Sequence, residues 1–516
     1  EVMLADFDQI DKYLVDPKQL FTNIKDIKDI ENQFGELSPE QAKALQDYLG
    51  VMNQQHFSEL RNNYLGVWGI LLQIYERFNL ELEKANTAYE GMVYRKAASI
   101  LSNPSSIPNL PKQLAFIGFN ALNECEKALF KRIKTEENTL FYWDYDPIFV
   151  QNPGYEAGLF IRENLLKFPN ALSKESFQHV DSENINVKIV AAPSTVAQTK
   201  LIPRILEEMK TQGAKLDVST AIVLPKENIL LPTLQAIPES VELLNITMGY
   251  PLRETPAFSL AELLVKLQIN GRKSKDGEES FYHRDVLGLL NHPYIRFCEP
   301  NEALRIVSEI KRRNRIYAKQ TEVATTSLLE SIFKIIENEE SITKYITSIC
   351  NQVSQVIAVK SKDEENQAFR IDLEFLFALF KSLKRVDGAL NDFNFTVSSR
   401  VYLQLLRKVF AQERVSFTGE PLMGLQVMGF LETRALDFEN IIILSFNDDM
   451  LPGRNHPVSF ITPSLRVAFG LPDYKHHDAV YAYYFYRLLN RAKNVYLVYS
   501  NKAEGLSSGE VSRFGM

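Results

Sequence analysis

The chain has 516 residues, which is too long for one ordinary hydrophobic core, so we expect roughly two to four domains. With 45% hydrophobic and 24% charged residues the composition is that of a soluble globular protein, and a net charge of −7 excludes a general attraction to nucleic acid, so that any such contact needs a local basic patch. The three cysteines (Cys125, Cys298 and Cys350) are far apart and form no CxxC pair, which argues against a disulfide framework or a cysteine-rich metal site and fits a reducing cytoplasm.

The sequence predicts neither a membrane span nor a signal peptide. No run of about 18 apolar residues occurs. The first residues, EVMLADFDQIDKYLVD, are acidic and lack the basic and apolar regions of a signal peptide. We therefore expect a cytoplasmic protein. Because the chain begins without methionine and stops at GEVSRFGM, we also expect it to be a segment of a longer protein.

The first half of the chain changes from helical to alternating character. Apolar residues recur at three- and four-residue spacing through residues 1–105, which predicts helices. Short apolar runs at 114–119 and 138–146 then predict strands, with the helix NECEKALFKRI between them. The same alternation continues in VKIVAAP (187–193) and STAIVLP (219–225), on either side of the helix TKLIPRILEEMKTQG. Unbroken apolar strands separated by helices predict a parallel sheet covered on both faces.

The second half interrupts this α/β pattern and then resumes it. Residues 276–400 are helical in pattern, including EALRIVSEIKRRNRIYAK up to residue 319. Strand-like runs return at 425–431, 440–446 and 495–500. We therefore expect an α/β domain with a helical insertion.

A search for active-site motifs is mostly negative. A phosphate-binding P-loop needs GxxxxGK[ST], and no Gly-Lys dipeptide occurs. His476, His477 and Asp478 lack the further ligands of a metal site, so we interpret them as a polar helix start with Asp478 as the N-cap. Asp144 and Asp146 end a strand, where carboxylates can bind Mg²⁺, but a structural role is the favoured interpretation.

Basic residues are the more suggestive feature. Lys311, Arg312 and Arg313 cluster in one predicted helix, where a solvated face is the favoured interpretation and a nucleic-acid or partner contact the alternative. Arg434 and Arg454 lie in loops of the α/β domain, and ligands bind such sheets at the carboxyl ends of the strands.

The stretch YRLLNRAKNVYLVYS (486–500) places Arg491 and Lys493 between a helix and a buried strand. A helix C-terminus favours positive charge, which accounts for Lys493. Arg491 is less easily explained in this way, because its sheet domain also carries the loops of Arg434 and Arg454.

These segments together resemble the superfamily 1 helicase group that includes UvrD, RecB and AddB. VMGFLETRALDFENIIILSFNDDMLPGR (427–454) is similar to motif V with its following strand and turn, and RLLNRAKNVYLVYS (487–500) to motif VI. The segments at 217–238 and 245–264 are similar to the motif IV region. The resemblance covers about 114–515 and implies RecA-like lobes with these divisions: a helical region at 1–110, the end of a first lobe at 111–185, a second lobe at 186–275 and 401–516, and a 2B-like insertion at 276–400.

The chain departs from active members of that group at a decisive position. Active members end one strand in an Asp-Glu pair that holds Mg²⁺ and positions the attacking water, whereas the equivalent strand here reads LAFIGF, with Gly118 and Phe119 at the two positions. Leu431 also replaces a usual histidine, and Asn490 a usual threonine. The motif VI arginine, Arg491, is kept, and Asp437 lies in the motif V-like segment, so the resemblance implies that both are remnants of a nucleotide site.

The Gly-Phe replacement, NDDMLPGR and the terminal SRF are most similar to the AddB-like family. That resemblance implies a helicase-like part without motor activity, in a protein that processes DNA double-strand breaks, with a nuclease domain of the PD-(D/E)XK type following the SRF position. It also implies single-stranded or end-bearing DNA and an AddA-like helicase subunit as partners.

Three functions remain open on the sequence alone. The leading one is a non-motor DNA-binding module, with Arg434, Arg454, Arg491 and Lys493 as contacts and Asn447 supporting their loop, and with the basic helix at 311–313 as a further contact. The second is an ATP-driven helicase whose P-loop lies upstream, and the third is a scaffold that docks a motor subunit. We expect no cofactor for the first and third, and ATP with Mg²⁺ only for the second.

Overall fold

The structure is a computed structural model, and it divides the chain into two compact units. The first unit comprises Glu1–Pro225 and Phe430–Met516, and the second comprises Lys226–Gly429. The helical insertion expected at 276–400 lies inside the second unit, which is wider at both ends. The structure describes residues 2–21, 58–102, 113–134, 139–172, 185–336, 342–363, 368–392, 397–416, 423–453, 458–503 and 509–515.

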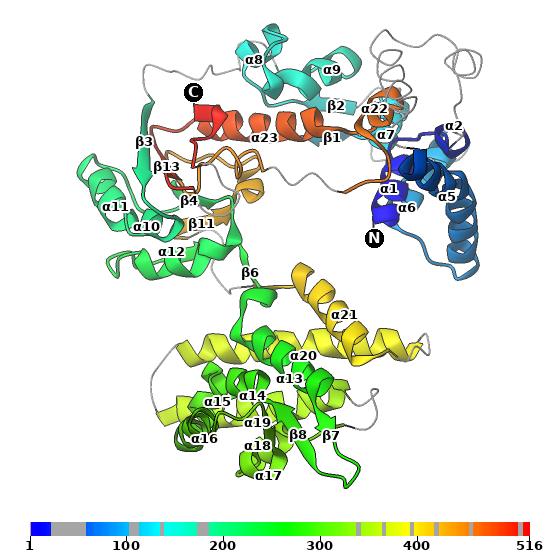
Figure 1. Ribbon diagram of the computed structural model, residues 1–516. Helices are drawn as coiled ribbons and strands as arrows, with labels where there is room; N and C mark the ends of the chain where they lie inside the picture. Colours follow the sequence, from blue (N-terminus) through cyan, green and yellow to red (C-terminus); the bar gives the residue numbers. More distant parts are fainter. Residues whose placement is uncertain are drawn as a thin grey trace. The chain divides into compact units, whose positions relative to one another are not determined.

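The predicted parallel α/β sheet is confirmed. Six strands lie in the order β3-β13-β12-β4-β11-β5 (Figure 1). They are β3 (Asn186–Ala192), β4 (Thr220–Leu224), β5 (Leu244–Ile246), β11 (Leu425–Gly429), β12 (Asn440–Ile443) and β13 (Asn494–Ser500). β12 pairs in parallel with both β13 and β4, aligning Asn440 with Asn494 and Thr220.

The burial of the strands explains their composition. Every residue of β4 (TAIVL) and of β12 (NIII) is buried, as expected for central strands of a parallel sheet covered on both faces. β3 lies at the edge of the sheet, and its exposed Val187 and Ile189 reflect that position. Helices α10 (Thr195–Thr199), α11 (Ile202–Thr211) and α12 (Leu230–Ala236) follow β3 and β4 along the chain.

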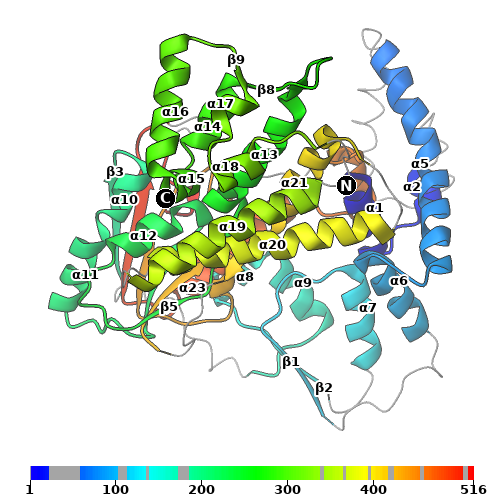
Figure 2. The same cartoon turned by 90° about the horizontal axis from the view of Figure 1, so that it is seen from below.

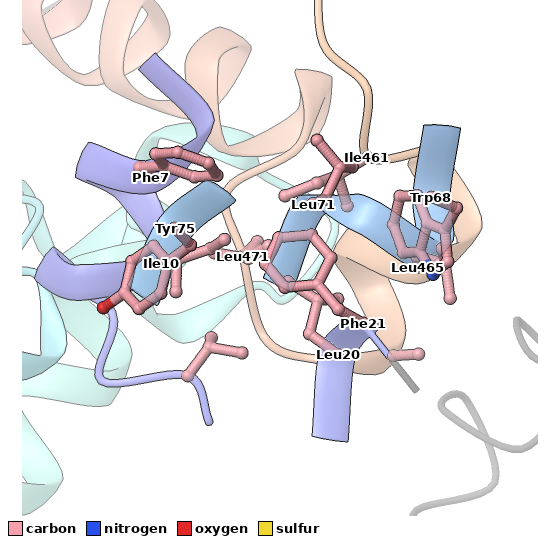
Figure 3. Packing of buried hydrophobic residues seen from close by; sticks show 12 residues of the cluster. Phe7, Ile10, Leu20, Phe21, Trp68, Leu71, Tyr75, Ile461, Leu465 and Leu471 are labelled. Carbon is pink, nitrogen blue, oxygen red and sulfur yellow. The ribbon is translucent and has the colours of Figure 1, made fainter. Parts of the chain in front are cut away.

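The helices predicted for residues 1–105 are confirmed in the described parts of that range. They are α1 (Val2–Lys12), α2 (Pro17–Phe21), α5 (Ser58–Lys84) and α6 (Glu90–Leu101). Their core includes Phe7, Trp68 and Tyr75 and is completed by Ile461 and Leu465 at the short helix α22 (Pro463–Ala468) (Figure 3). The N-terminal helices are thus packed against a segment from the other end of the chain.

A second part of the first unit is built on two parallel strands, β1 (Leu114–Ile117) and β2 (Thr139–Tyr142). Helix α7 (Glu124–Ile133) follows β1 and begins with a capping box between Asn123 and Glu126. Its core joins Phe116 and Phe130 to Tyr483 of helix α23 (Tyr474–Leu489). Helices α8 (Pro147–Gln151) and α9 (Leu159–Lys167) complete this part.

Helix α23 begins differently from the prediction. Its N-cap is Asp473, whose side chain accepts a hydrogen bond from the His476 N–H while His476 Nδ1 reaches back to the Asp473 N–H. The assignment of Asp478 as N-cap is therefore wrong: Asp478 lies within the helix and pairs with Arg513. The Asp473–His476 pair meets the backbone geometry of a capping box, which requires a spacing of three residues.

The second unit is mainly helical, and its two long helices α19 (Ile342–Asp363) and α20 (Ala368–Asp392) lie side by side (Figure 2). Helix α13 (Pro256–Asn270) is the central one, because apolar residues from Ala257 to Leu267 are buried around its circumference. The remaining helices are α14 (His283–Leu290), α15 (Pro293–Cys298), α16 (Pro300–Arg313), α17 (Gln320–Val323), α18 (Ser327–Ile332) and α21 (Ser399–Gln412).

Small antiparallel sheets in the second unit were not predicted. Strands β7 (Arg272–Lys273), β8 (Glu279–Tyr282) and β9 (Tyr317–Lys319) form one of them, and β6 (Gly249–Pro251) pairs with β10 (Arg414–Ser416). The helix expected to reach residue 319 ends at Arg313, because Asn314 adopts a left-handed conformation (φ 46°) that stops it. No helix of the described residues has the length and apolarity to cross a membrane.

Candidate functional site

Four charged residues of the first unit form one connected group, which we call the arginine–carboxylate cluster: Asp144, Asp437, Arg487 and Arg491. Arg487 donates from Nε to Asp144 Oδ2 (2.8 Å) and from Nη1 to Asp437 Oδ1 (2.6 Å). The same Nη1 donates to the carbonyl oxygen of Leu436 (2.7 Å). Arg491 pairs with the other carboxylate oxygen, Oδ2, of Asp437. One carboxylate is therefore shared by two guanidinium groups.

Three chain segments that are distant in sequence build this cluster. Asp144 follows β2, Asp437 precedes β12, and Arg487 lies in the last turn of α23. Arg491 lies between α23 and β13, so it and Asp437 are at the amino ends of parallel strands. Arg491 therefore does not lie at the carboxyl end of a strand, where parallel sheets usually bind ligands. The helix before β13 places it at the opposite, amino end.

The two arginines of the cluster differ in exposure. The Arg487 side chain is 9% exposed, and that of Arg491 is 57% exposed. Burial disfavours the charged form of Arg487, yet the carboxylates of Asp144 and Asp437 overcome this and raise its pKa. Arg487 is consequently a permanent buried cation that links β2 to the segment before β12, while Arg491 keeps part of its guanidinium accessible to a ligand.

The position of the expected Asp-Glu pair lies beside this cluster. Gly118 follows β1 with φ 76°, and a Cβ placed on it would lie 3.9 Å from the Cβ of Ala435. Phe119 packs edge-on against Phe130, with 5.5 Å between ring centroids. Neither side chain has an oxygen, so these two positions supply no carboxylate that could bind a metal ion or activate a water molecule.

The aspartates near β2 have structural partners. Asp146 is the N-cap of α8, accepting a hydrogen bond from the Ile148 N–H (2.8 Å). Asp144 binds Arg487, and its carbonyl oxygen accepts a bond from the Tyr483 hydroxyl (2.8 Å). Among the residues that the structure describes, no group of three or more metal-ligating side chains is found. These contacts agree with the structural interpretation of Asp144 and Asp146.

A small hollow adjoins the buried side of Arg487. Its lining is rich in aromatic residues and comes from α8 with the residues on either side of it, and from α23 with the residue after it: Tyr145, Asp146, Phe149, Val150, Ala157, Gly158, Tyr483, Tyr486, Arg487 and Asn490. The Asn490 Oδ1 atom is buried and has no hydrogen-bond partner among the residues that the structure describes. Asn490 therefore presents an unsatisfied acceptor next to the cluster.

Arg434 and Lys493 lie near the cluster without belonging to its network. Arg434 is exposed in the segment after β11, and its charge acts on the Tyr483 hydroxyl, whose pKa is raised chiefly by burial. Lys493 pairs with Glu439 at 3.0 Å, and both side chains are more than half exposed. Arg454 lies outside the described residues. The structure thus brings Arg434, Asp437 and Arg491 into one region of the first unit.

Asn447 is buried and holds backbone segments together. Its amide nitrogen donates to the carbonyl oxygens of Ser500 (2.8 Å) and Glu510 (3.1 Å), and its oxygen accepts from the Ser500 N–H (3.0 Å). The side chain therefore positions the loop after β12 instead of facing solvent. The neighbouring Asp448 and Asp478 flank Arg513 of the terminal SRF segment, so that segment is docked in the first unit.

The basic helix α16 belongs to the second unit. Arg313 pairs with Glu309 and with Glu322 (3.2 Å), and Arg312 lies 3.9 Å from Glu309. Lys311 is exposed and has no ion-pair partner among the described residues. Two of the three predicted cations are therefore neutralised locally, which favours the solvated-face interpretation for Arg312 and Arg313.

Sequence reasoning missed Arg487, the most buried cation of the site. Its signal was present: Arg487 and Arg491 are four residues apart, the spacing that places two side chains on one face of a helix. A scan against models of known protein families finds no match, and a search of curated proteins finds no significant relative.

Proposed function

We propose that this chain is a non-motor, helicase-like DNA-binding module of a protein that processes DNA double-strand breaks for recombinational repair. One observation carries the proposal: Arg491, to which the resemblance assigns nucleotide contact, is bound to Asp437, and Gly118 and Phe119 stand at the two positions where the resemblance leads one to expect acids. An arginine finger has no chemistry to serve where no metal or attacking water can be held.

DNA contact would use the exposed cations of the cluster region. Arg434 is exposed, and Arg491 retains a half-exposed guanidinium although Asp437 binds it. Guanidinium groups bind phosphate oxygens through paired donors, which supports a sequence-independent contact to a DNA backbone. Arg487 would act through its neighbours, because its donors are committed to Asp144, Asp437 and Leu436.

Single-strand binding across a range of salt concentrations tests this function. We expect Arg434→Ala combined with Arg491→Ala to weaken binding of a dT oligonucleotide and to reduce the slope of log K against log salt by about 1.4, or roughly 0.7 per lost phosphate contact. Lys84→Gln is the matched control, because Lys84 of α5 is a cation of the first unit with an exposure of 59%, close to that of Arg491, and is not a proposed DNA contact. Unchanged affinity and slope in the double variant would contradict the proposal.

A scaffold that docks a motor subunit is the second candidate. One face of the β1–β2 pair leaves Ile117 68% exposed and Leu140 46% exposed. Parallel strands are usually covered on both faces, so this apolar face favours a protein contact. Co-purification with a motor subunit that is lost in Ile117→Asp, in a chain with no affinity for DNA, would select this candidate over the first.

A further inference from the structure

Helix α20 of the second unit carries an exposed aromatic side chain among cations. Phe377 is 65% exposed, and it lines a surface hollow with Phe380, Lys381, Lys384 and Arg385. The spacing of these residues, at three, four, seven and eight positions from Phe377, places them along one face of the helix. We call these five residues the α20 patch.

The core of the second unit does not need Phe377. The opposite face of α20 already supplies a buried stripe that includes Phe375, Leu379 and Leu383, and this stripe faces the unit's interior. Phe377 points away from that stripe and exposes most of its ring. An exposed aromatic ring costs free energy in water, so the absence of a packing role indicates a binding role.

The charges around this ring are mostly positive. Lys384 Nζ lies 4.5 Å from the centroid of the Phe380 ring, a cation–π contact that holds the ammonium group beside the aromatic face. Lys381 has no carboxylate partner among the described residues, whereas Arg385 pairs with Glu413. Glu374, one turn earlier, is the acidic residue on the same side of the helix. Lys381 and Lys384 are therefore the cations available to an anionic ligand.

We propose that the α20 patch binds single-stranded nucleic acid, with a base stacked on Phe377 and the adjoining phosphates on Lys381 and Lys384. Non-specific single-strand sites combine aromatic platforms with basic side chains in this way. An acidic amphipathic peptide fits less well, because a peptide-binding helix face presents apolar residues at successive turns, and here the turn after Phe380 presents Lys384. This contact lies in the second unit and does not depend on the function proposed for the arginine–carboxylate cluster.

Stacking can be tested with the full chain and a dT oligonucleotide that contains one 2-aminopurine. We expect Phe377→Leu to weaken binding by about five- to a hundredfold and to abolish the quenching of 2-aminopurine fluorescence, because leucine has no ring. Phe377→Trp should restore both. Val359→Ala is the matched control, since Val359 of α19 is also 65% exposed and should have no effect on either measurement.

The proposed phosphate contacts are tested by the salt dependence of binding. We expect Lys381→Gln with Lys384→Gln to lower the salt slope of binding by about 1.4. Unchanged affinity, quenching and slope in all these variants would overturn the proposal, and so would a loss of binding to a glutamate-rich peptide with DNA binding intact. The Arg434 and Arg491 variants are measured in the same assay but change a different site. The DNA contact proposed for those two arginines and the one proposed for the α20 patch can therefore be rejected independently.

Discussion

The arginine–carboxylate cluster and the α20 patch use positive charge in opposite ways. In the cluster, Arg487 and Arg491 are matched by Asp144 and Asp437, and the guanidinium of Arg487 is almost fully buried. In the α20 patch, Lys381 and Lys384 lie beside the aromatic rings of Phe377 and Phe380. A paired, buried cation holds structure together, because removing it strands its carboxylates. An unpaired cation at the surface is free to exchange water and counterions for a ligand.

This difference shows why a count of basic residues is a poor guide to nucleic-acid binding here. The helix α16 has the densest basic run, yet two of its three predicted cations face glutamates. The α20 patch also has three cations, but its Lys381 has no carboxylate partner within the described ranges and lies beside an exposed ring. The partners of a charge therefore decide its role more than its sign does.

The largest expected effect is a loss of folding stability when the arginine–carboxylate cluster loses Arg487. Arg487→Ala removes the central cation with its three hydrogen bonds, leaving Asp144 without this partner and Asp437 paired with Arg491 alone, so we expect a loss of about 3–5 kcal/mol in the free energy of unfolding. Urea denaturation of the full chain measures it. Arg491→Ala is the control and should cost no more than about 1 kcal/mol, because its ion pair is exposed. Equal losses in the two variants would erase the distinction between structural and available cations.

The pH dependence of stability tests one buried residue of the second unit, His292, without any ligand. His292 is 4% exposed, and burial lowers its pKa to about 4. Its Nε2 lies 3.0 Å from the Pro256 carbonyl oxygen, and its Nδ1 accepts a bond from the Tyr294 N–H, so the ring is neutral when folded.

The unfolded chain binds this proton near pH 6.5, whereas the folded chain binds it only near pH 4. Stability is therefore constant above pH 6.5 as far as His292 is concerned, falls as the pH drops from 6.5 toward 4, and reaches a loss of about 3 kcal/mol. His292→Asn keeps a helix-capping side chain that does not titrate, so we expect it to flatten this part of the profile in thermal or urea unfolding. The same pH dependence in both proteins would assign the effect to other groups.

Placing an acid at position 119, where the resemblance to helicases leads one to expect a carboxylate, should damage the fold without creating an enzyme. Phe119→Glu places a carboxylate in the aromatic cluster around Phe130, and we expect it to cost about 2–3 kcal/mol in unfolding free energy. No DNA-stimulated ATP hydrolysis should appear in a phosphate-release assay. Gly118→Asn is the milder control, because asparagine tolerates the left-handed conformation of this position. Hydrolysis by the unmodified full-length protein would instead revive the helicase alternative.

The smallest predicted effect is on single-strand affinity, and it follows from a substitution that removes the charge paired with Arg491. Asp437→Asn removes the charge that neutralises Arg491, so we expect single-strand affinity to rise by about two- to tenfold while the salt slope steepens. Glu439→Gln makes the same change for Lys493 and serves as the comparison. A fall in affinity would show that Asp437 positions Arg491 for the ligand instead of competing with it.

Much of the fold could be predicted, and the reasons are local. The runs at 187–193, 219–225 and 440–446 are mainly apolar, and each contains a strand of the parallel sheet; those in the second and third runs are fully buried, and β3 in the first lies at the edge. The helix after β1 begins with Asn123 and Glu126, a signal that needs only three residues. The N-cap of α23 was misassigned by five residues along the chain, because Asp473 and Asp478 both precede apolar positions and only backbone geometry separates them.

The sequence by itself determined that this is an α/β protein and that Gly118 and Phe119 supply no carboxylate. Only the tertiary structure decided which cations are neutralised. Asp144 and Arg487 are separated by 343 residues, and they meet because the order of the chain through β1, β2 and α23 brings them together. Hydrophobic periodicity is read over a few turns of chain, whereas an ion pair depends on which distant segments the folded core places side by side.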